Sequence, residues 1–195
     1  NCSASSNNGQ SRTAKILIYI DGILKKTIII NQNGVINSKK VIVTAGNLHK
    51  LILLNERNNI SKLELEGTIN AVDFKTMRDS LLLKELDLSK VQITSYTGTN
   101  GTSTYSTNYS QNAIPPNAFS VYGKEYPLSK IILPLSLEEI GSAAFSFCSK
   151  LYEINIPSNV KILNGFYNCY NLKKINIPNS VTQIHGYAFK NCSGL

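Results

Sequence analysis

The sequence predicts a right-handed solenoid of stacked repeats. Such a fold has a parallel β-sheet on its concave face, short helices or turns on its convex face and, in this chain, a small N-terminal β cap. Residues 128–150, 151–171 and 172–194 share one pattern of apolar residues, and a single cysteine lies near the end of each segment. An isoleucine-rich segment with hairpin turns precedes them. One such segment cannot bury its own apolar side, but several stacked segments can.

Each repeat begins as a strand. In the last one, Leu172, Ile175 and Ile177 form one apolar face, and Pro178, which has no N–H for a sheet, ends the strand. The second half returns the chain across the convex side, where we expect two buried columns. The period of 21–23 residues lies in the leucine-rich-repeat range, so the predicted fold class is a leucine-rich-repeat solenoid. The buried columns are Phe145, Phe166 and Phe189, and Cys148, Cys169 and Cys192.

The pattern extends toward the N-terminus, where LKELDL at 83–88 follows ISKLEL at 60–65 by 23 residues. The next strand of this kind comes 45 residues later, and AIPPNAF at 113–119 keeps the Ile-to-Phe spacing of the repeats. One repeat therefore carries an insertion. The predicted domain spans 46–195, with units at about 60–82, 83–127 with the insertion, 128–150, 151–171 and 172–194.

The segment before the repeats differs in composition. Residues 1–13 are polar and low in complexity, which predicts a flexible tether. In residues 14–45, Asp-Gly and Asn-Gly pairs separate isoleucine-rich runs, which predicts a β-hairpin that caps the solenoid, with a separate small binding domain as the alternative. The pattern further predicts an amphipathic helix over 46–59 and a convex helix over 73–82.

Composition argues against catalysis and nucleic-acid binding. The chain has 20 basic and 12 acidic residues, a net charge of +8, but no basic run exceeds two residues, which favours a solvated surface. His49 and His185 have no partner at the spacing of a catalytic triad or metal site. The repeat cysteines are too far apart for zinc. We expect no catalytic residue, no metal and no cofactor.

The last repeat, IPNSVTQIHGYAFKNCSGL, resembles the BspA-type leucine-rich repeat of bacterial surface proteins. Residues 128–195 match this pattern closely and residues 46–127 more loosely. The resemblance implies an extracytoplasmic protein of the bacterial cell surface or outer membrane that adheres to host or matrix proteins. Cys2, followed by Ser and Asn, is similar to the acylated cysteine of a bacterial lipoprotein, and a chance surface cysteine is the alternative.

Two regions are candidate partner contacts. Alignment of the strands places alternating charges in one exposed column and mostly polar residues, including the like-charged Glu64 and Asp87, in a second. Residues 94–112 consist only of Thr, Ser, Tyr, Asn, Gly and Gln, a composition used in adaptable contact loops. The candidates in the first column are Lys62, Glu85, Lys130, Glu153 and Lys174; in the second, Glu64, Asp87, Ile132, Asn155 and Asn176; and in the loop, Tyr96, Tyr105 and Tyr109.

The functional hypothesis is a non-enzymatic adhesion protein that binds a protein partner through the sheet and the tyrosine-containing loop. A carbohydrate-binding accessory protein and a structural spacer within a larger surface protein are the alternatives.

Overall fold

The computed structural model describes residues 12–20, 23–32, 38–105, 107–120 and 124–195. The chain divides into two compact units, Asn1–Asn37 and Ser38–Leu195. Cys2 and most of the expected tether lie outside the described residues.

The first unit contains an antiparallel hairpin. Strand β1 (Arg12–Ile20) pairs with β2 (Ile23–Gln32), and the register shifts between Ile18 and Tyr19. This pairing agrees with the hairpin expected within residues 14–45. That the hairpin caps the repeats stays a prediction.

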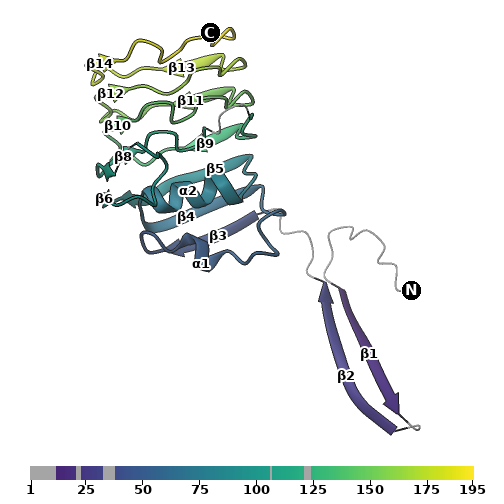
Figure 1. Ribbon diagram of the computed structural model, residues 1–195. Coiled ribbons are helices and arrows are strands. Elements are labelled where there is room, and N and C mark those ends of the chain that lie inside the picture. Colours follow the sequence, from purple (N-terminus) through teal and green to yellow (C-terminus); the bar gives the residue numbers. More distant parts are fainter. Residues whose placement is uncertain (1–11, 21–22, 33–37, 106, 121–123) are drawn as a thin grey trace. The chain divides into compact units, whose positions relative to one another are not determined.

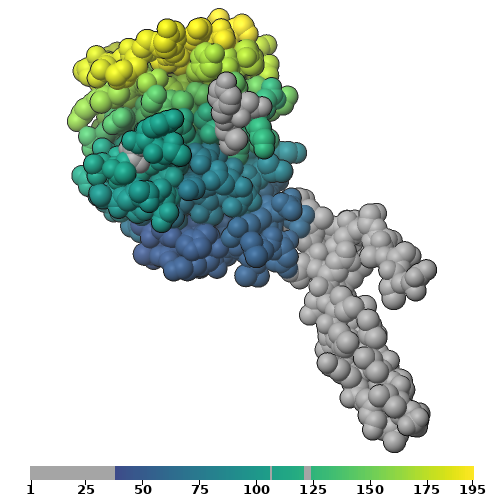
Figure 2. Space-filling view, in the orientation of Figure 1, coloured from purple at the N-terminus to yellow at the C-terminus, as the bar shows by residue number. Residues whose placement is uncertain are grey.

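The second unit is built on parallel strands that follow one another along the solenoid (Figure 1). Strands β3 (Ser38–Val43), β4 (Lys62–Ile69), β5 (Glu85–Ile93) and β9 (Lys130–Ile132) form one hydrogen-bonded sheet in this order. Strands β11 (Glu153–Asn155) and β13 (Lys174–Asn176) continue the series as a parallel pair, and β11 contacts β9. In the space-filling view, the successive turns form bands from blue to yellow (Figure 2).

Strand β3 was expected in the N-terminal hairpin segment, but it is the first strand of the repeat sheet. Its residues Val41 and Val43 pair with Leu65 and Gly67 of β4. Both valines are buried, as is Leu65, so SKKVIV supplies the same alternating apolar face as the later strands. The described part of the chain therefore has six solenoid strands, one more than the sequence predicted.

A second parallel ladder runs beside the first, where the sequence predicted turns. Its order is β14 (Gln183–Ile184), β12 (Ile162–Leu163), β10 (Glu139–Ile140) and β8 (Ala113–Ile114). Ile140 pairs with Ile114, which agrees with residues 83–127 forming one repeat that carries an insertion. Within the insertion, β6 (Tyr96–Thr97) pairs with β7 (Asn108–Tyr109).

The aromatic column predicted for the interior is present. Phe119, Phe145, Phe166 and Phe189 stack in sequence, with ring centroids 5.5, 5.3 and 5.5 Å apart and interplanar angles of 19°, 14° and 6°. Phe74 closes the column with an edge-to-face contact at 5.9 Å. The ring of each turn thus covers the ring of the next. A single turn is too small to form a core of its own, and this stacking buries its apolar surface.

The cysteine column is also present, and its thiols are free. Cys169 Sγ donates to the Phe145 carbonyl oxygen at 3.2 Å, and Cys192 Sγ donates to that of Phe166 at 2.9 Å. Burial raises the pKa of Cys148 well above its usual value and that of Cys169 to about 12. Both therefore stay protonated near neutral pH, so neither is a reactive thiolate.

The prediction of a helix over residues 46–59 is wrong for most of that segment. Helix α1 covers only Leu48–Leu51, and Ile52 is already extended, with φ −109° and ψ 109°. The Arg57 side chain donates to the carbonyl oxygens of His49 at 3.1 Å and Ile52 at 3.5 Å. These bonds satisfy carbonyl groups that a longer helix would have used.

The helix expected over 73–82 is present as α2, which runs two residues earlier, over Ala71–Ser80. It begins with a capping box. Asn70 Oδ1 accepts a hydrogen bond from the Val72 N–H at 2.9 Å, and the Asp73 carboxylate accepts one from the Asn70 N–H at 2.9 Å. The cap satisfies N–H groups that the first turn of a helix leaves unpaired.

Replacing Asp73 should destabilise the fold strongly. The fully buried carboxylate also accepts the N–H groups of Gly46 at 2.6 Å and Leu48 at 2.9 Å, joining α1 to α2. Asp73→Ala leaves three N–H groups without this acceptor, and we expect a loss of at least about 3 kcal/mol in the free energy of unfolding, measured by denaturant titration. Asp79→Ala, on the same helix with a 42% exposed side chain, should cost less than about 1 kcal/mol. Equal losses would contradict this role of Asp73.

Candidate functional site

The first predicted column of charges lies in register on the sheet. Lys62 pairs with Glu85, Glu85 with Lys130, and Glu153 with Lys174, which confirms the predicted alignment of these strands. Lys62 Nζ lies 3.2 Å from Glu85 Oε2, and Lys174 Nζ lies 3.1 Å from Glu153 Oε1. All four side chains are more than 40% exposed, so each pair contributes no more than about 1 kcal/mol.

The second column contains the predicted pair of acidic neighbours, because Glu64 pairs with Asp87 in the sheet. Lys40 Nζ, however, lies 3.0 Å from Glu64 Oε1, and Lys90 Nζ lies 3.7 Å from the same oxygen. The hydrogen bond to Glu64 raises the pKa of Lys40. Sequence reasoning missed that Lys40 offsets the charge of Glu64, because Lys40 lies on β3, which was assigned to the cap.

The other members of this column are Ile132, which pairs with Asp87, and Asn155, which pairs with Asn176. We call the outward side chains of β3, β4, β5, β9, β11 and β13 the sheet face. It brings together all ten predicted column residues.

The tyrosine-containing insertion has a defined fold. Tyr96 and Tyr109 lie on the paired strands β6 and β7, with ring centroids 5.9 Å apart. Tyr109 Oη accepts the Ser103 N–H at 3.1 Å and donates to the Ser103 carbonyl oxygen at 3.2 Å. Tyr109 is 6% exposed and supports the loop from inside, whereas Tyr105 is 99% exposed. Of the three predicted contact tyrosines, Tyr105 is thus the most available to a partner.

Arg78 on α2 holds the insertion against the solenoid. Its Nη1 donates to the carbonyl oxygens of Thr102 at 2.6 Å and Asn117 at 3.0 Å, while its Nε lies 2.6 Å from Asp79 Oδ1. Thr102 Oγ1 donates in turn to the Pro116 carbonyl oxygen at 2.5 Å. Sequence reasoning missed Arg78 because its acceptors are backbone atoms 24 and 39 residues away.

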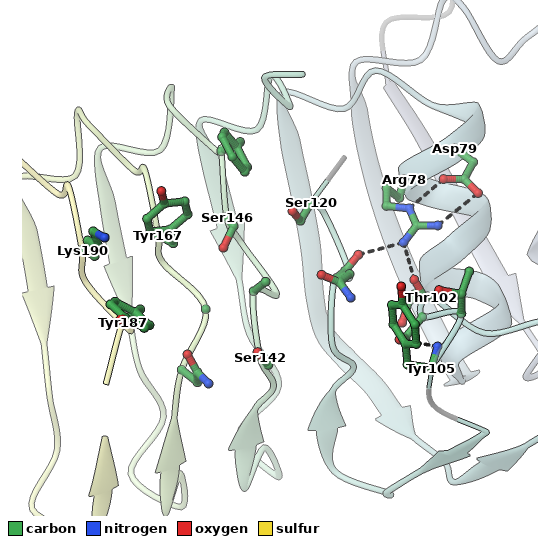
Figure 3. A pocket seen from close by; sticks show the side chains of 17 residues that line it. Arg78, Asp79, Thr102, Tyr105, Ser120, Ser142, Ser146, Tyr167, Tyr187 and Lys190 are labelled. Atoms are coloured by element: carbon green, nitrogen blue, oxygen red, sulfur yellow. Dashed lines mark hydrogen bonds and ion pairs between the residues drawn. The ribbon is translucent and has the colours of Figure 1, made fainter. Parts of the chain in front are cut away.

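A groove of about 720 Å³ lies between the insertion, α2 and the convex turns of the following repeats. Figure 3 shows Arg78, Thr102 and Tyr105 at one end of it and Tyr167, Tyr187 and Lys190 at the other. Lys190 Nζ lies 4.9 Å from the Tyr187 ring centroid and 6.0 Å from that of Tyr167. We call this feature the convex groove.

Of the groove residues, sequence analysis singled out Tyr105 and included residues 102–104 only as part of the candidate contact loop 94–112. A signal was present, because Ser146, Tyr167 and Lys190 each follow the column phenylalanine of their repeat and therefore share one position of the repeat, which lines the groove.

Within the described ranges, no three His, Cys, Asp or Glu side chains are grouped so that they could hold a metal ion. The helices in this part of the chain are also too short or too polar to cross a membrane.

Stacked turns, a parallel sheet and repeated Phe and Cys columns define a leucine-rich-repeat solenoid. Residues 80–195 match the family described as the BspA type leucine rich repeat region, in six copies. The chain belongs to this family.

Two solved bacterial proteins are similar to the chain. A leucine-rich repeat protein from Bacteroides ovatus aligns at 24% identity and a TM-score of 0.48, over 80% of this chain and 36% of that one. A leucine rich cell surface protein from Faecalibacterium prausnitzii aligns at 19% identity and a TM-score of 0.33, over 72% of this chain and 53% of that one. The chain thus spans about a third of the first protein and half of the second. A search of curated proteins gives no significant match.

The order of the insertion should depend on Gly101. A Cβ atom at this position would overlap the Tyr109 ring, whereas one at Gly186 would meet no atom within 4 Å. Gly101→Ala should therefore displace Tyr109, break its bonds to Ser103 and accelerate hydrogen exchange of the Ser103 amide at least tenfold. Gly186→Ala should leave that amide unchanged. Unchanged exchange in Gly101→Ala would show that Tyr109 does not order the loop.

Proposed function

We propose that this chain is a non-enzymatic binding protein of the bacterial cell surface, which uses its leucine-rich-repeat scaffold to contact host or matrix proteins. Leucine-rich-repeat proteins generally mediate protein interactions, and membership of the BspA-type family supports a surface location. Attachment through an acylated Cys2 is part of this proposal.

The observation that carries the proposal is the balanced charge pattern of the sheet face. Five basic and five acidic side chains lie on the paired strands, and each basic residue pairs with an acidic one. A polyanion such as nucleic acid is bound by an excess of positive charge, which this face does not offer. A protein surface with its own mixture of charges is the complementary partner. The basic residues are Lys40, Lys62, Lys90, Lys130 and Lys174, and the acidic ones are Glu64, Glu66, Glu85, Asp87 and Glu153.

Apolar residues on the same face support a protein partner. Ile42 is 74% exposed beside Glu66, and Ile132 is 42% exposed beside Asp87. Protein interfaces combine apolar anchors with a polar surround, and burial of the anchors supplies much of the binding energy. The sheet is also rigid, because its strands are fixed by neighbours, so little ordering cost accompanies binding.

A charge exchange on the sheet face should separate binding from stability. The double variant Lys62→Glu/Glu85→Lys keeps an ion pair at this position but reverses the pattern shown to a partner. We expect the free energy of unfolding to change by less than about 1 kcal/mol, and the affinity for a bound matrix protein to fall at least tenfold. Surface plasmon resonance against immobilised collagen, laminin and fibronectin provides the measurement.

The matched control is Glu138→Lys/Lys161→Glu, which exchanges an ion pair of 3.2 Å between the residues that directly precede β10 and β12. It should bind as the unaltered chain does. The proposal fails if none of the three matrix proteins binds saturably, or if the control exchange weakens binding as much as the sheet exchange.

A further inference from the structure

The convex groove has a lining rich in neutral hydrogen-bonding groups. Of its 17 lining residues, 11 have a hydroxyl or side-chain amide group. Aromatic rings accompany them, because Tyr105, Phe147, Tyr167 and Tyr187 also line the groove. Tyr105 and Tyr187 are 99% and 73% exposed, so their ring faces are available to a ligand.

The charges in the groove are already engaged. Arg78 pairs with Asp79 and donates to two backbone carbonyl groups of the insertion and its following segment. Lys190, at the other end, lies against the rings of Tyr187 and Tyr167. An ionic ligand would therefore have to displace existing partners, whereas a neutral polar ligand would not.

The backbone of the groove is engaged as well. The N–H groups of Asn117, Phe145 and Phe147 donate to carbonyl groups of the next turn at 2.9, 2.8 and 3.0 Å. An extended peptide that binds by strand addition needs free backbone groups, and these three N–H groups are therefore not available to it. Side-chain hydroxyl groups remain, and each of them can both donate and accept a hydrogen bond.

Two features set the middle of the groove apart from a plain repeat surface. Ser146 is 1% exposed, and its Oγ has no hydrogen-bond partner among the described residues. Next to it, Phe147 has φ +65° at the position where the following repeats place Asn168 and Asn191, with φ +62°. Asparagine tolerates this conformation better than phenylalanine does, so Phe147 keeps an aromatic ring in the groove at a cost in backbone strain.

We propose that the convex groove binds a neutral oligosaccharide. The hydroxyl groups of a sugar match groups that donate and accept, and the apolar C–H face of a pyranose ring stacks on tyrosine. Successive turns that line the groove have their column phenylalanine rings 5.3–5.5 Å apart, a spacing that suits a linear chain of sugar units. This inference uses a different surface from the sheet face and does not depend on binding of a matrix protein.

A glycan array of neutral plant, fungal and mammalian oligosaccharides, followed by calorimetric titration of the best ligand, tests the proposal. We expect saturable binding, and a loss of affinity of about tenfold in each of Tyr105→Ala and Tyr187→Ala. The control is Tyr152→Ala, which removes a 54% exposed ring outside the groove lining and should bind as the unaltered chain does.

A second pair of variants tests the groove without changing its aromatic rings. Ser146 and Ser149 are both buried with unpartnered hydroxyl groups, but only Ser146 lines the groove. Neither Ser146→Ala nor Ser149→Ala should lower the melting temperature, and only Ser146→Ala should weaken glycan binding. The proposal is overturned if no neutral glycan binds saturably, or if groove and control variants bind equally well.

Discussion

The contact between one turn and the next is the constraint on which the rest of this structure depends. Phe145 is fully buried because the rings of Phe119 and Phe166 cover its two faces at 5.5 and 5.3 Å. The thiol of Cys169 and the N–H of Phe147 each bond to the backbone of an adjacent turn. Residues of the inner columns are therefore restricted in size and polarity, while the outward positions are free to vary and can carry function.

Both candidate binding surfaces follow from this division. The sheet face repeats one outward position from strand to strand, which brings Lys62, Glu85 and Lys130 side by side although they are far apart in the sequence. The convex groove uses the position after the column phenylalanine, together with an insertion that Arg78 fixes to the solenoid. The same stacking thus creates two surfaces of different chemistry, one of mixed charge and one neutral and aromatic.

The sequence was informative where the repeat was regular. Column alignment predicted the register of Lys62 with Glu85 and the stacked phenylalanines, because the buried pattern permits only one register. Sequence analysis missed β3, because the alternation of polar and apolar residues in SKKVIV is short and lies next to isoleucine-rich hairpin strands. It also missed the order of the insertion, since the bonds of Tyr109 to Ser103 and of Arg78 to Thr102 depend on loop geometry that has no sequence period.

The stacking account is tested most directly by comparing an inner ring with an outer one. Phe145 has stacked rings on both faces, whereas Phe189, among the described residues, stacks only on Phe166 and is half-buried. In the 195-residue chain, Phe145→Ala should lower the free energy of unfolding by about 3–5 kcal/mol. Phe189→Ala should lower it by about half as much, because it removes one ring contact and less buried surface. Equal losses in denaturant titrations of the two variants would contradict the claim that each turn is stabilised by its neighbours.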